Sequence, residues 1–241
     1  FASIDAPVRT LLVTSSNPGE GKTTTAANLA FAMAMDGKRV ILVDTDLRRP
    51  SMHKLLSLPT MPGLTDVLLD HATLAETLLE HEDMPNLVAL MSGSTPPNPG
   101  ELLNSRKFRN LVQELSAQAD IVIFDSPPVL VAADAAILAS QMDGTILVVE
   151  TGETKKGAAR QTLRTLQQAR ANLLGIAYNK MRIMDGSGYF YYQYQYKTPA
   201  MTDSAPANGR KRLSANGAET NTENAESANH WHAADQDDSK Q

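Results

Sequence analysis

The chain has 241 residues, of which 42% are apolar and 20% charged, so it has the composition of a globular protein. Its length fits one sizeable α/β domain or a smaller domain with a tail, and argues against several independent domains. It contains no cysteine, which excludes a disulfide framework, a thiolate zinc site and a cysteine nucleophile, and favours a reducing compartment such as the cytoplasm. The net charge of −5 and the lack of a long Lys/Arg run argue against nucleic acid as a partner. No stretch is apolar for long enough to span a bilayer, but the chain begins at Phe1 and we expect it to be a fragment.

The first three-quarters of the chain alternate short apolar runs with longer segments of helical periodicity. The runs, rich in Val, Ile and Leu, predict buried strands, and the segments between them predict crossover helices. This alternation favours a mostly parallel sheet with helices on both faces, because parallel strands need such crossovers. The predicted strands are Leu11–Val13, Val40–Val43, Leu87–Leu90, Ile121–Phe124, Ile146–Val149 and Leu173–Ala177, and the predicted helices are Thr24–Met35, Glu101–Ala117 and Ala158–Ala171.

A glycine-rich loop joins the first predicted strand to the first predicted helix. Gly19 and Gly21 let backbone N–H groups close around phosphate oxygens, Lys22 can reach the β- and γ-phosphates, and the Thr23 hydroxyl can bind Mg²⁺. The strand, loop and helix together predict a P-loop NTPase-like α/β fold. Ser16 stands where the strict pattern has its first glycine, and a turn that binds nothing is the alternative. The predicted nucleotide-binding residues of the loop are Ser16, Asn17, Pro18, Gly19, Glu20, Gly21, Lys22, Thr23 and Thr24.

Three aspartates stand at the carboxyl ends of two predicted strands. Asp44 and Asp46 follow one strand and Asp125 another, so in an open parallel sheet all three should lie beside the glycine-rich loop. Together they predict a Mg²⁺ site, in which one of Asp44 and Asp46 serves the metal and the other accepts a proton from an attacking hydroxyl. Each aspartate taken alone could merely cap a helix or turn. Arg48 and Arg49 could stabilise transferred charge, bind an acidic partner or form surface ion pairs, and stay outside the predicted core site.

All six tyrosines of the chain lie between Tyr178 and Tyr196, after the last predicted helix. So many phenol rings outside a predicted core favour modification over packing, and beside a site for phosphoryl transfer they favour the role of substrate. The alternatives are an edge strand, because Tyr and Gln alternate from 192 to 196, or an interaction segment. Five of the tyrosines form a cluster in the segment 189–196, namely Tyr189, Tyr191, Tyr192, Tyr194 and Tyr196.

The composition changes after the tyrosine cluster. Large apolar residues of the segment 197–241 are reduced to Met201, Leu213 and Trp231, which cannot bury a core, so we expect a disordered tail. The expected organisation is therefore a P-loop domain over 1–188, the tyrosine cluster over 189–196 and a disordered tail over 197–241.

These motifs together resemble the bacterial tyrosine kinases of capsule and exopolysaccharide assembly. The resemblance implies a tyrosine autokinase that uses ATP and Mg²⁺ and phosphorylates its own tyrosine cluster. By the same resemblance, the catalytic residues are Lys22, Asp44, Asp46 and Asp125, and the metal ligands are Thr23, Asp44 and Asp125. Asn179 resembles the position that reads the adenine edge in related ATPases. The resemblance covers Val8 to Tyr196 and rests on the loop Ser16–Thr23, the motifs Ile41–Asp46 and Ile121–Asp125, the segment Ser92–Leu103 and the tyrosine cluster.

The resemblance also implies partners and a location. It implies a membrane activator, the polysaccharide co-polymerase, either fused upstream or separate, and a location in the cytoplasm at the inner face of the cell membrane. It further implies a ring of subunits in which each tyrosine cluster reaches a neighbouring active site, until phosphate charge breaks the ring. Two departures are visible, because the helix that usually precedes the first strand is missing and 45 residues follow Tyr196.

Two other classes share parts of the pattern. Switch ATPases that partition plasmids or position the septum have the same fold and acidic motifs, but they carry a signature lysine where this chain has Asn17. A non-catalytic module that uses ATP only to order an interaction segment is the third possibility. The presence of Lys22 and of the three aspartates Asp44, Asp46 and Asp125 argues against such a non-catalytic module.

Overall fold

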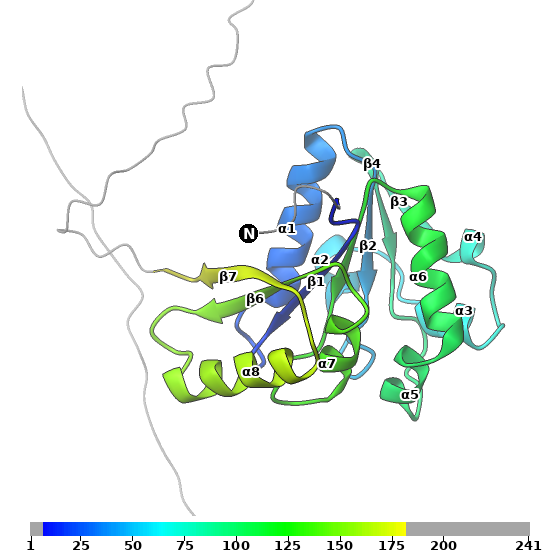
Figure 1. Ribbon diagram of the computed structural model, residues 1–241. Coiled ribbons are helices and arrows are strands. Elements are labelled where there is room, and N and C mark those ends of the chain that lie inside the picture. The colour runs from blue at the N-terminus through cyan, green and yellow to red at the C-terminus, as the bar shows by residue number, and fades with distance from the viewer. Residues whose placement is uncertain (1–6, 182–241) are drawn as a thin grey trace, which may run out of the picture. The chain divides into compact units, whose positions relative to one another are not determined.

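The computed structural model describes residues 7–181, which form a seven-stranded sheet with helices on both faces (Figure 1). The strand order is β3-β4-β2-β5-β1-β6-β7, so β1, which leads into the glycine-rich loop, is flanked on both sides. The strands are β1 (Thr10–Ser15), β2 (Val40–Asp44), β3 (Leu78–His81), β4 (Met84–Leu90), β5 (Ile121–Asp125), β6 (Gly144–Glu150) and β7 (Leu173–Asn179). The helices are α1 (Lys22–Met35), α2 (Met52–Leu56), α3 (Leu64–Leu68), α4 (Leu74–Thr77), α5 (Pro99–Leu103), α6 (Arg106–Gln118), α7 (Asp134–Ala139) and α8 (Lys156–Gln168).

Six strands are parallel, and β3 pairs antiparallel with β4 at one edge. The expected mostly parallel sheet is therefore confirmed. Strands β1, β2 and β5 are buried at every position, which explains their unbroken apolar sequences, since both of their faces are covered. Because parallel strands all end at the same edge, the carboxyl ends of these three strands lie together.

Each face of the sheet has its own apolar core. Helices α1 and α2 cover one face, where Leu11 and Leu42 pack against the alanines of α1. The helices from α3 to α8 cover the other face, where Leu12 and Phe124 pack against Phe108 of α6. Alternate residues of one strand thus serve opposite cores, as the period of two in a strand requires.

Several element boundaries differ from the predictions. The single helix predicted over Glu101–Ala117 is wrong, because the structure has two helices that are interrupted at Asn104 and Ser105. The Ser105 hydroxyl accepts a hydrogen bond from the backbone N–H of Phe108 and so begins α6 as its N-cap. The edge strand β3 was not predicted. Its four residues are half-buried or exposed, so they lack the apolar run that marks the inner strands.

The tyrosine cluster and the expected disordered tail lie outside the described residues, and both remain predictions. Within residues 7–181, no helix is both long enough and apolar enough to cross a membrane.

Candidate active site

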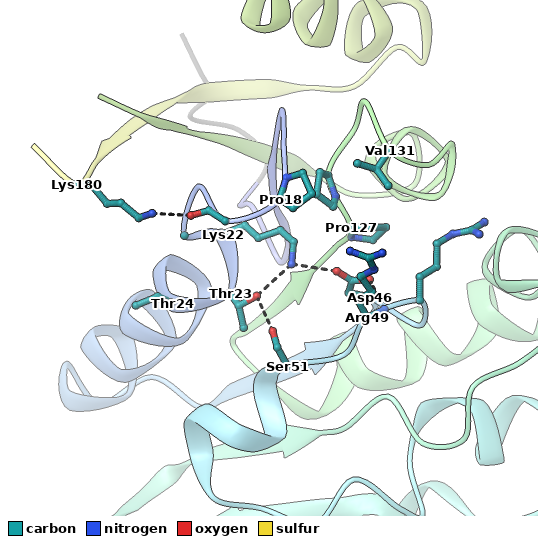
Figure 2. A pocket seen from close by; sticks show the side chains of 14 residues that line it. Pro18, Lys22, Thr23, Thr24, Asp46, Arg49, Ser51, Pro127, Val131 and Lys180 are labelled. Atoms are coloured by element: carbon teal, nitrogen blue, oxygen red, sulfur yellow. Dashed lines mark hydrogen bonds and ion pairs between the residues drawn. The ribbon is translucent and has the colours of Figure 1, made fainter. Parts of the chain in front are cut away.

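A cleft of about 770 Å³ opens where the carboxyl ends of the central strands meet the amino end of α1 (Figure 2). Residues from the glycine-rich loop, from the loop after β2, from the loop after β5 and from the end of β7 line it. These lining residues are Pro18, Gly19, Gly21, Lys22, Thr23, Thr24, Asp46, Arg48, Arg49, Ser51, Pro127, Pro128, Val131 and Lys180.

The glycine-rich loop needs its two glycines for different reasons. Gly19 and Gly21 both have positive φ angles, of 84° and 94°, which L side chains rarely adopt. At Gly21 space is also limiting, because an added Cβ would lie 2.0 Å from the Asn179 amide nitrogen. The backbone N–H groups that begin α1 have no acceptor within the helix, and no side chain caps them. They are available to an anion such as a phosphate.

Glu20 holds the glycine-rich loop from inside. Its carboxylate is buried and accepts hydrogen bonds from the backbone N–H groups of Ser16 and Asn17, at 2.8 and 3.0 Å. It also accepts from the Asn17 amide at 3.1 Å and from the Thr154 hydroxyl at 2.7 Å. The Ser16 hydroxyl in turn accepts a hydrogen bond from Thr162 of α8. Ser16, Asn17 and Glu20 therefore shape the loop and do not line the cleft.

Lys22 joins the loop to the predicted carboxylates. Its ammonium donates to the Thr23 hydroxyl at 3.1 Å and lies 3.1 Å from Asp46 (Figure 2). It also lies 3.7 Å from Asp125. Thr23 is also 3.4 Å from the Ser51 hydroxyl. Burial by itself would lower the pKa of Lys22, but the nearby carboxylates of Asp125 and Asp46 outweigh burial and raise it. Lys22 is thus a fixed cation at the floor of the cleft.

The three aspartates lie together but in different settings. Asp44 and Asp125 are register partners in β2 and β5, and both are fully buried. Burial, together with the neighbouring carboxylates, raises the pKa of Asp44 to about 8, and burial raises the pKa of Asp125 to about 6 against the effect of Lys22. Asp46 is the aspartate that lines the cleft.

Asp44 mainly supports the loop after β2. Its carboxylate accepts hydrogen bonds from the backbone N–H groups of Asp46 and Met52, at 3.1 and 3.4 Å. Both oxygens of Asp125, in contrast, are buried without a hydrogen-bond partner among residues 7–181. Such an unsatisfied carboxylate beside the Thr23 and Lys22 side chains is suited to a bound cation and its water.

In residues 7–181, no three carboxylate or imidazole side chains converge as a self-sufficient metal site. Mg²⁺ does not require one, because it is commonly held by one or two carboxylates together with waters and substrate phosphates. The donors present therefore suit Mg²⁺ bound with a nucleotide better than a metal bound by the protein alone.

The end of β7 supports the glycine-rich loop from outside. The Asn179 amide donates to the carbonyl of Glu20 at 3.0 Å, and the Lys180 ammonium donates to the carbonyl of Gly19 at 2.7 Å and pairs with Glu150 at 2.9 Å. Sequence reasoning missed Lys180, Thr154 and Thr162, because no local motif marks residues that meet the loop only after folding. The expected adenine contact of Asn179 remains a prediction.

The class of protein follows from this geometry. A glycine-rich loop between a central parallel strand and a helix, with carboxylates at the ends of two neighbouring strands, defines a P-loop nucleotide-binding domain. Consistent with that class, the family model described as "AAA domain" matches residues 8–176.

Curated relatives then identify the family. Tyrosine-protein kinase YwqD of Bacillus subtilis (strain 168) is 43% identical over 192 residues, which are 80% of this chain and 81% of that protein. Tyrosine-protein kinase CpsD of Streptococcus pneumoniae serotype 4 is 37% identical over 177 residues, 73% of this chain and 78% of that protein. The chain belongs to the bacterial tyrosine-protein kinase family, and its enzyme class is tyrosine-protein kinase.

Solved structures agree. The chimerical protein CapA2B2 has a TM-score of 0.72 and 36% identity, with 74% of this chain and 78% of that chain covered. The kinase domain of Escherichia coli tyrosine kinase ETK has a TM-score of 0.69 and 27% identity, with 77% and 74% covered. The septum site-determining protein MinD of Pyrococcus horikoshii OT3, complexed with Mg-ADP, has a TM-score of 0.59 at 24% identity over 70% of this chain and 68% of that chain. That last likeness shows the shared fold alone.

Proposed function

We propose that this chain transfers the γ-phosphoryl group of Mg-ATP to tyrosine hydroxyls, including those of its own cluster, Tyr189, Tyr191, Tyr192, Tyr194 and Tyr196. The observation that supports this most strongly is the meeting of Lys22, Thr23 and Asp46 within 3.1 Å contacts at the floor of the cleft. A phosphate-binding cation, a metal-binding hydroxyl and a carboxylate that lines the cleft are the parts that phosphoryl transfer to a hydroxyl requires.

The nucleotide side of the cleft is built from the glycine-rich loop. The backbone N–H groups from Gly19 to Thr24 would bind the phosphates, and Lys22 would balance the charge that develops on the γ-phosphoryl oxygens. Thr23, Asp44 and Asp125 would hold Mg²⁺, which when bound neutralises phosphate charge and orients the β- and γ-phosphates. Asn179 would contribute at the adenine side, next to its hydrogen bond with the loop.

The acceptor side of the cleft points to Asp46 as the base. Asp44 is enclosed and engaged with backbone N–H groups, whereas Asp46 lines the cleft. The tyrosine hydroxyl would give its proton to Asp46 as its oxygen attacks phosphorus in line with the leaving ADP. Lys22, at 3.1 Å, would hold the Asp46 side chain in place before the substrates bind.

We further propose a role in the control of capsular or exopolysaccharide polymerisation and export, with a membrane activator that places the kinase at the inner face of the membrane. In EpsB of Ralstonia solanacearum, 35% identical, the matched part is only 26% of that protein, so the kinase region belongs to a longer chain there. This supports an activator that is fused in some relatives and separate in others. Ring-like self-association belongs to the same proposal.

The test is peptide mass spectrometry of the chain after incubation with Mg-ATP, with and without a co-expressed membrane activator. Lys22→Met should abolish phosphate incorporation at residues 189–196, since the variant loses its phosphate-binding cation, whereas the exposed Lys38→Met should label as the parent does. Equal labelling of Lys22→Met and the parent would show that the assigned site is wrong. Absent labelling with intact ATP hydrolysis, even with the activator, would favour a switch ATPase.

A second variant tests the substrate assignment. Replacement of the five clustered tyrosines by Phe should abolish self-labelling but leave nucleotide binding intact, because none of these residues belongs to the glycine-rich loop. Nucleotide binding is measured by titration calorimetry. Phosphate found elsewhere on this variant, at the parent's rate, would contradict the assignment.

A further inference from the structure

Two arginines at the cleft are not used by the proposed chemistry. Arg48 and Arg49 follow the catalytic carboxylate Asp46 in the loop after β2, and the side chains of both line the cleft. Both residues are exposed, in contrast to the buried carboxylates of the floor. The cleft therefore has Lys22 paired with carboxylates at its floor and two arginines at its rim.

Arg48 is held in a fixed position. Its Nε and Nη2 atoms donate to the two oxygens of Asp134 at 2.6 and 3.1 Å, and Asp134, the first residue of α7, is only 2% exposed. A bidentate pair with a buried carboxylate fixes the plane of the guanidinium and leaves its remaining N–H donors available. The side chain of Arg48 itself is 45% exposed, so this pair anchors the loop at the rim of the cleft.

The backbone of Arg49 is held in place, whereas its guanidinium forms no ion pair with the described residues. Its backbone N–H donates to the Asp46 carboxylate at 3.1 Å, which ties the position of the residue to that of the proposed base. No carboxylate in the described part of the chain lies within ion-pair distance of its guanidinium. An anion bound to Arg49 would thus sit close to a tyrosine that is being phosphorylated.

The part of the cleft beside Asp46 suits an aromatic ring. Pro127 and Pro128 line the cleft after β5, and the apolar side chain of Val131 is 58% exposed at its rim. Figure 2 shows Pro127 and Val131 on the Asp46 side of Lys22, away from Thr24 and Lys180. A tyrosine ring that packed here would bring its hydroxyl toward Asp46, with Arg49 beside it.

We propose that Arg49, in a loop anchored by the Arg48–Asp134 pair, binds the phosphate of a phosphotyrosine that neighbours the acceptor tyrosine. This inference rests on the proposed function. The segment 188–196 contains no charged residue, so only phosphorylation gives it an anion, of nearly two negative charges. The exposed guanidinium of Arg49 at the rim attracts that phosphate. Phosphorylation of the cluster would then be sequential, each phosphate favouring the next transfer.

The spacing of the cluster fits this arrangement. Tyr192, Tyr194 and Tyr196 stand at every second position, which in an extended chain places neighbouring rings about 7 Å apart on one side. Residues 47 and 48 form a turn that brings the backbone N–H of Arg49 within 3.1 Å of the Asp46 carboxylate, so the base and the basic rim lie close together. An extended segment can therefore present one tyrosine to the base and the next one to the basic rim.

The experiment uses the full chain with its five clustered tyrosines replaced by Phe. The added peptide then supplies the only tyrosine from the cluster. Two peptides span residues 188–197 and keep Tyr192 as the single acceptor, with Phe at the other tyrosine positions. One of them carries phosphotyrosine at position 194. We expect the KM of the phosphorylated peptide to be lower by about five-fold or more at low salt, and this preference to shrink as salt screens it.

Variants of Arg49 test whether the preference for the phosphorylated peptide arises at the basic rim. In Arg49→Ala the ratio of the two KM values should fall to about one, and Arg49→Lys should keep part of the preference because it retains a point charge. Arg39→Ala is the matched control, since Arg39 pairs with Asp120 at the opposite end of β2 and should leave the ratio unchanged.

The outcomes are separable. Equal KM values for the two peptides in the parent, or a preference that survives in Arg49→Ala, would overturn the inference. A rise in the KM for ATP in Arg49→Ala that leaves the peptide ratio intact would assign Arg49 to the nucleotide and would also overturn it. Failure of the parent to label either peptide while it hydrolyses ATP would instead overturn the proposed function, and this inference with it.

Discussion

Asp44, Asp46 and Asp125 show how residues of one type acquire different properties within one site. Asp46 reaches the cleft and pairs with Lys22, whereas Asp44 and Asp125 face each other across two neighbouring strands without access to water. The same burial that prepares a metal site therefore raises the pKa of both carboxyl groups in the nucleotide-free protein, although Lys22 lies 3.7 Å from Asp125 and opposes the rise there.

The raised pKa of Asp44 predicts a pH dependence of stability. Burial beside other carboxylates raises its pKa from 3.8 to about 8, so between these pH values the folded chain holds a proton that the unfolded chain releases. The stabilisation is full below pH 3.8 and is lost as the pH rises toward 8. Asp44→Asn removes this loss. In EDTA, its free energy of unfolding relative to the parent should rise by about 1 kcal/mol or more between pH 5 and pH 8.

Urea unfolding at several pH values checks this expectation, and the exposed Asp83→Asn should show no such trend. If the difference in free energy of unfolding between Asp44→Asn and the parent stays constant with pH, the expectation is contradicted. The same variant should lose kinase activity, which separates the role of Asp44 in activity from its effect on stability.

The sequence predicted which residues gather at the site but not which aspartate lines the cleft and which ones are enclosed. Strand ends in a parallel sheet are fixed by topology, so Asp44, Asp46 and Asp125 could be placed beside Lys22 in advance. Which aspartate faces the cleft depends on how the chain turns after β2, where Asp44 accepts hydrogen bonds from two backbone N–H groups. Glu20 was assigned to nucleotide binding with the rest of its loop, and only the folded chain reveals its contact with Thr154.

At the scale of elements, the glycine-rich loop is stabilised by parts of the chain far from it in sequence. Thr154 comes from the turn between β6 and α8, Thr162 from α8, and Asn179 and Lys180 from the end of β7. These contacts add to the hydrogen bonds that Glu20 accepts from Ser16 and Asn17 within the loop, and together they fix its shape. Glu20 is the centre of this support.

Glu20→Ala should therefore loosen the loop. The substitution leaves the buried N–H of Ser16 and the N–H of Asn17 without acceptors, which we expect to lower the free energy of unfolding by about 2 kcal/mol and to weaken ATP binding. Chemical denaturation and nucleotide titration measure the two effects, with Glu114→Ala on the exposed face of α6 as control. Unchanged nucleotide affinity in Glu20→Ala would show that the loop holds its shape without this carboxylate.

Element prediction succeeded where both faces of a strand are buried and failed at the margins. The inner strands are recognisable in the sequence as continuous apolar runs, because no position along them is exposed to water. β3 is short and partly exposed, and the interruption between α5 and α6 depends on a serine cap that also occurs within helices. Such features depend more on the parts of the fold against which they pack than on the local sequence.

At the scale of the whole molecule, ligand binding should stabilise the fold as a unit, because the cleft joins strands from the middle of the sheet. Mg-ATP at about a hundred times its dissociation constant contributes about 2.7 kcal/mol to the free energy of unfolding. For a domain of this size, this raises the melting temperature by about 5 °C or more. Scanning calorimetry should show the rise in the parent and in Lys38→Met but not in Lys22→Met. A similar rise in Lys22→Met would place the bound nucleotide elsewhere.

The central place of β1 also constrains how the protein is made. β1 precedes the other described strands in sequence, yet it pairs with β5, where Thr10 lies beside Val122, and with β6, where Leu11 lies beside Gly144. These pairings close long loops, so the glycine-rich loop leaves the ribosome before β5, β6 and β7 and lacks their support until they follow. Because Asn179 and Lys180 lie at the end of β7, we expect ribosome-bound chains to lack nucleotide affinity until β7 has emerged. Synthesis itself would thus delay the onset of kinase activity until the domain is complete.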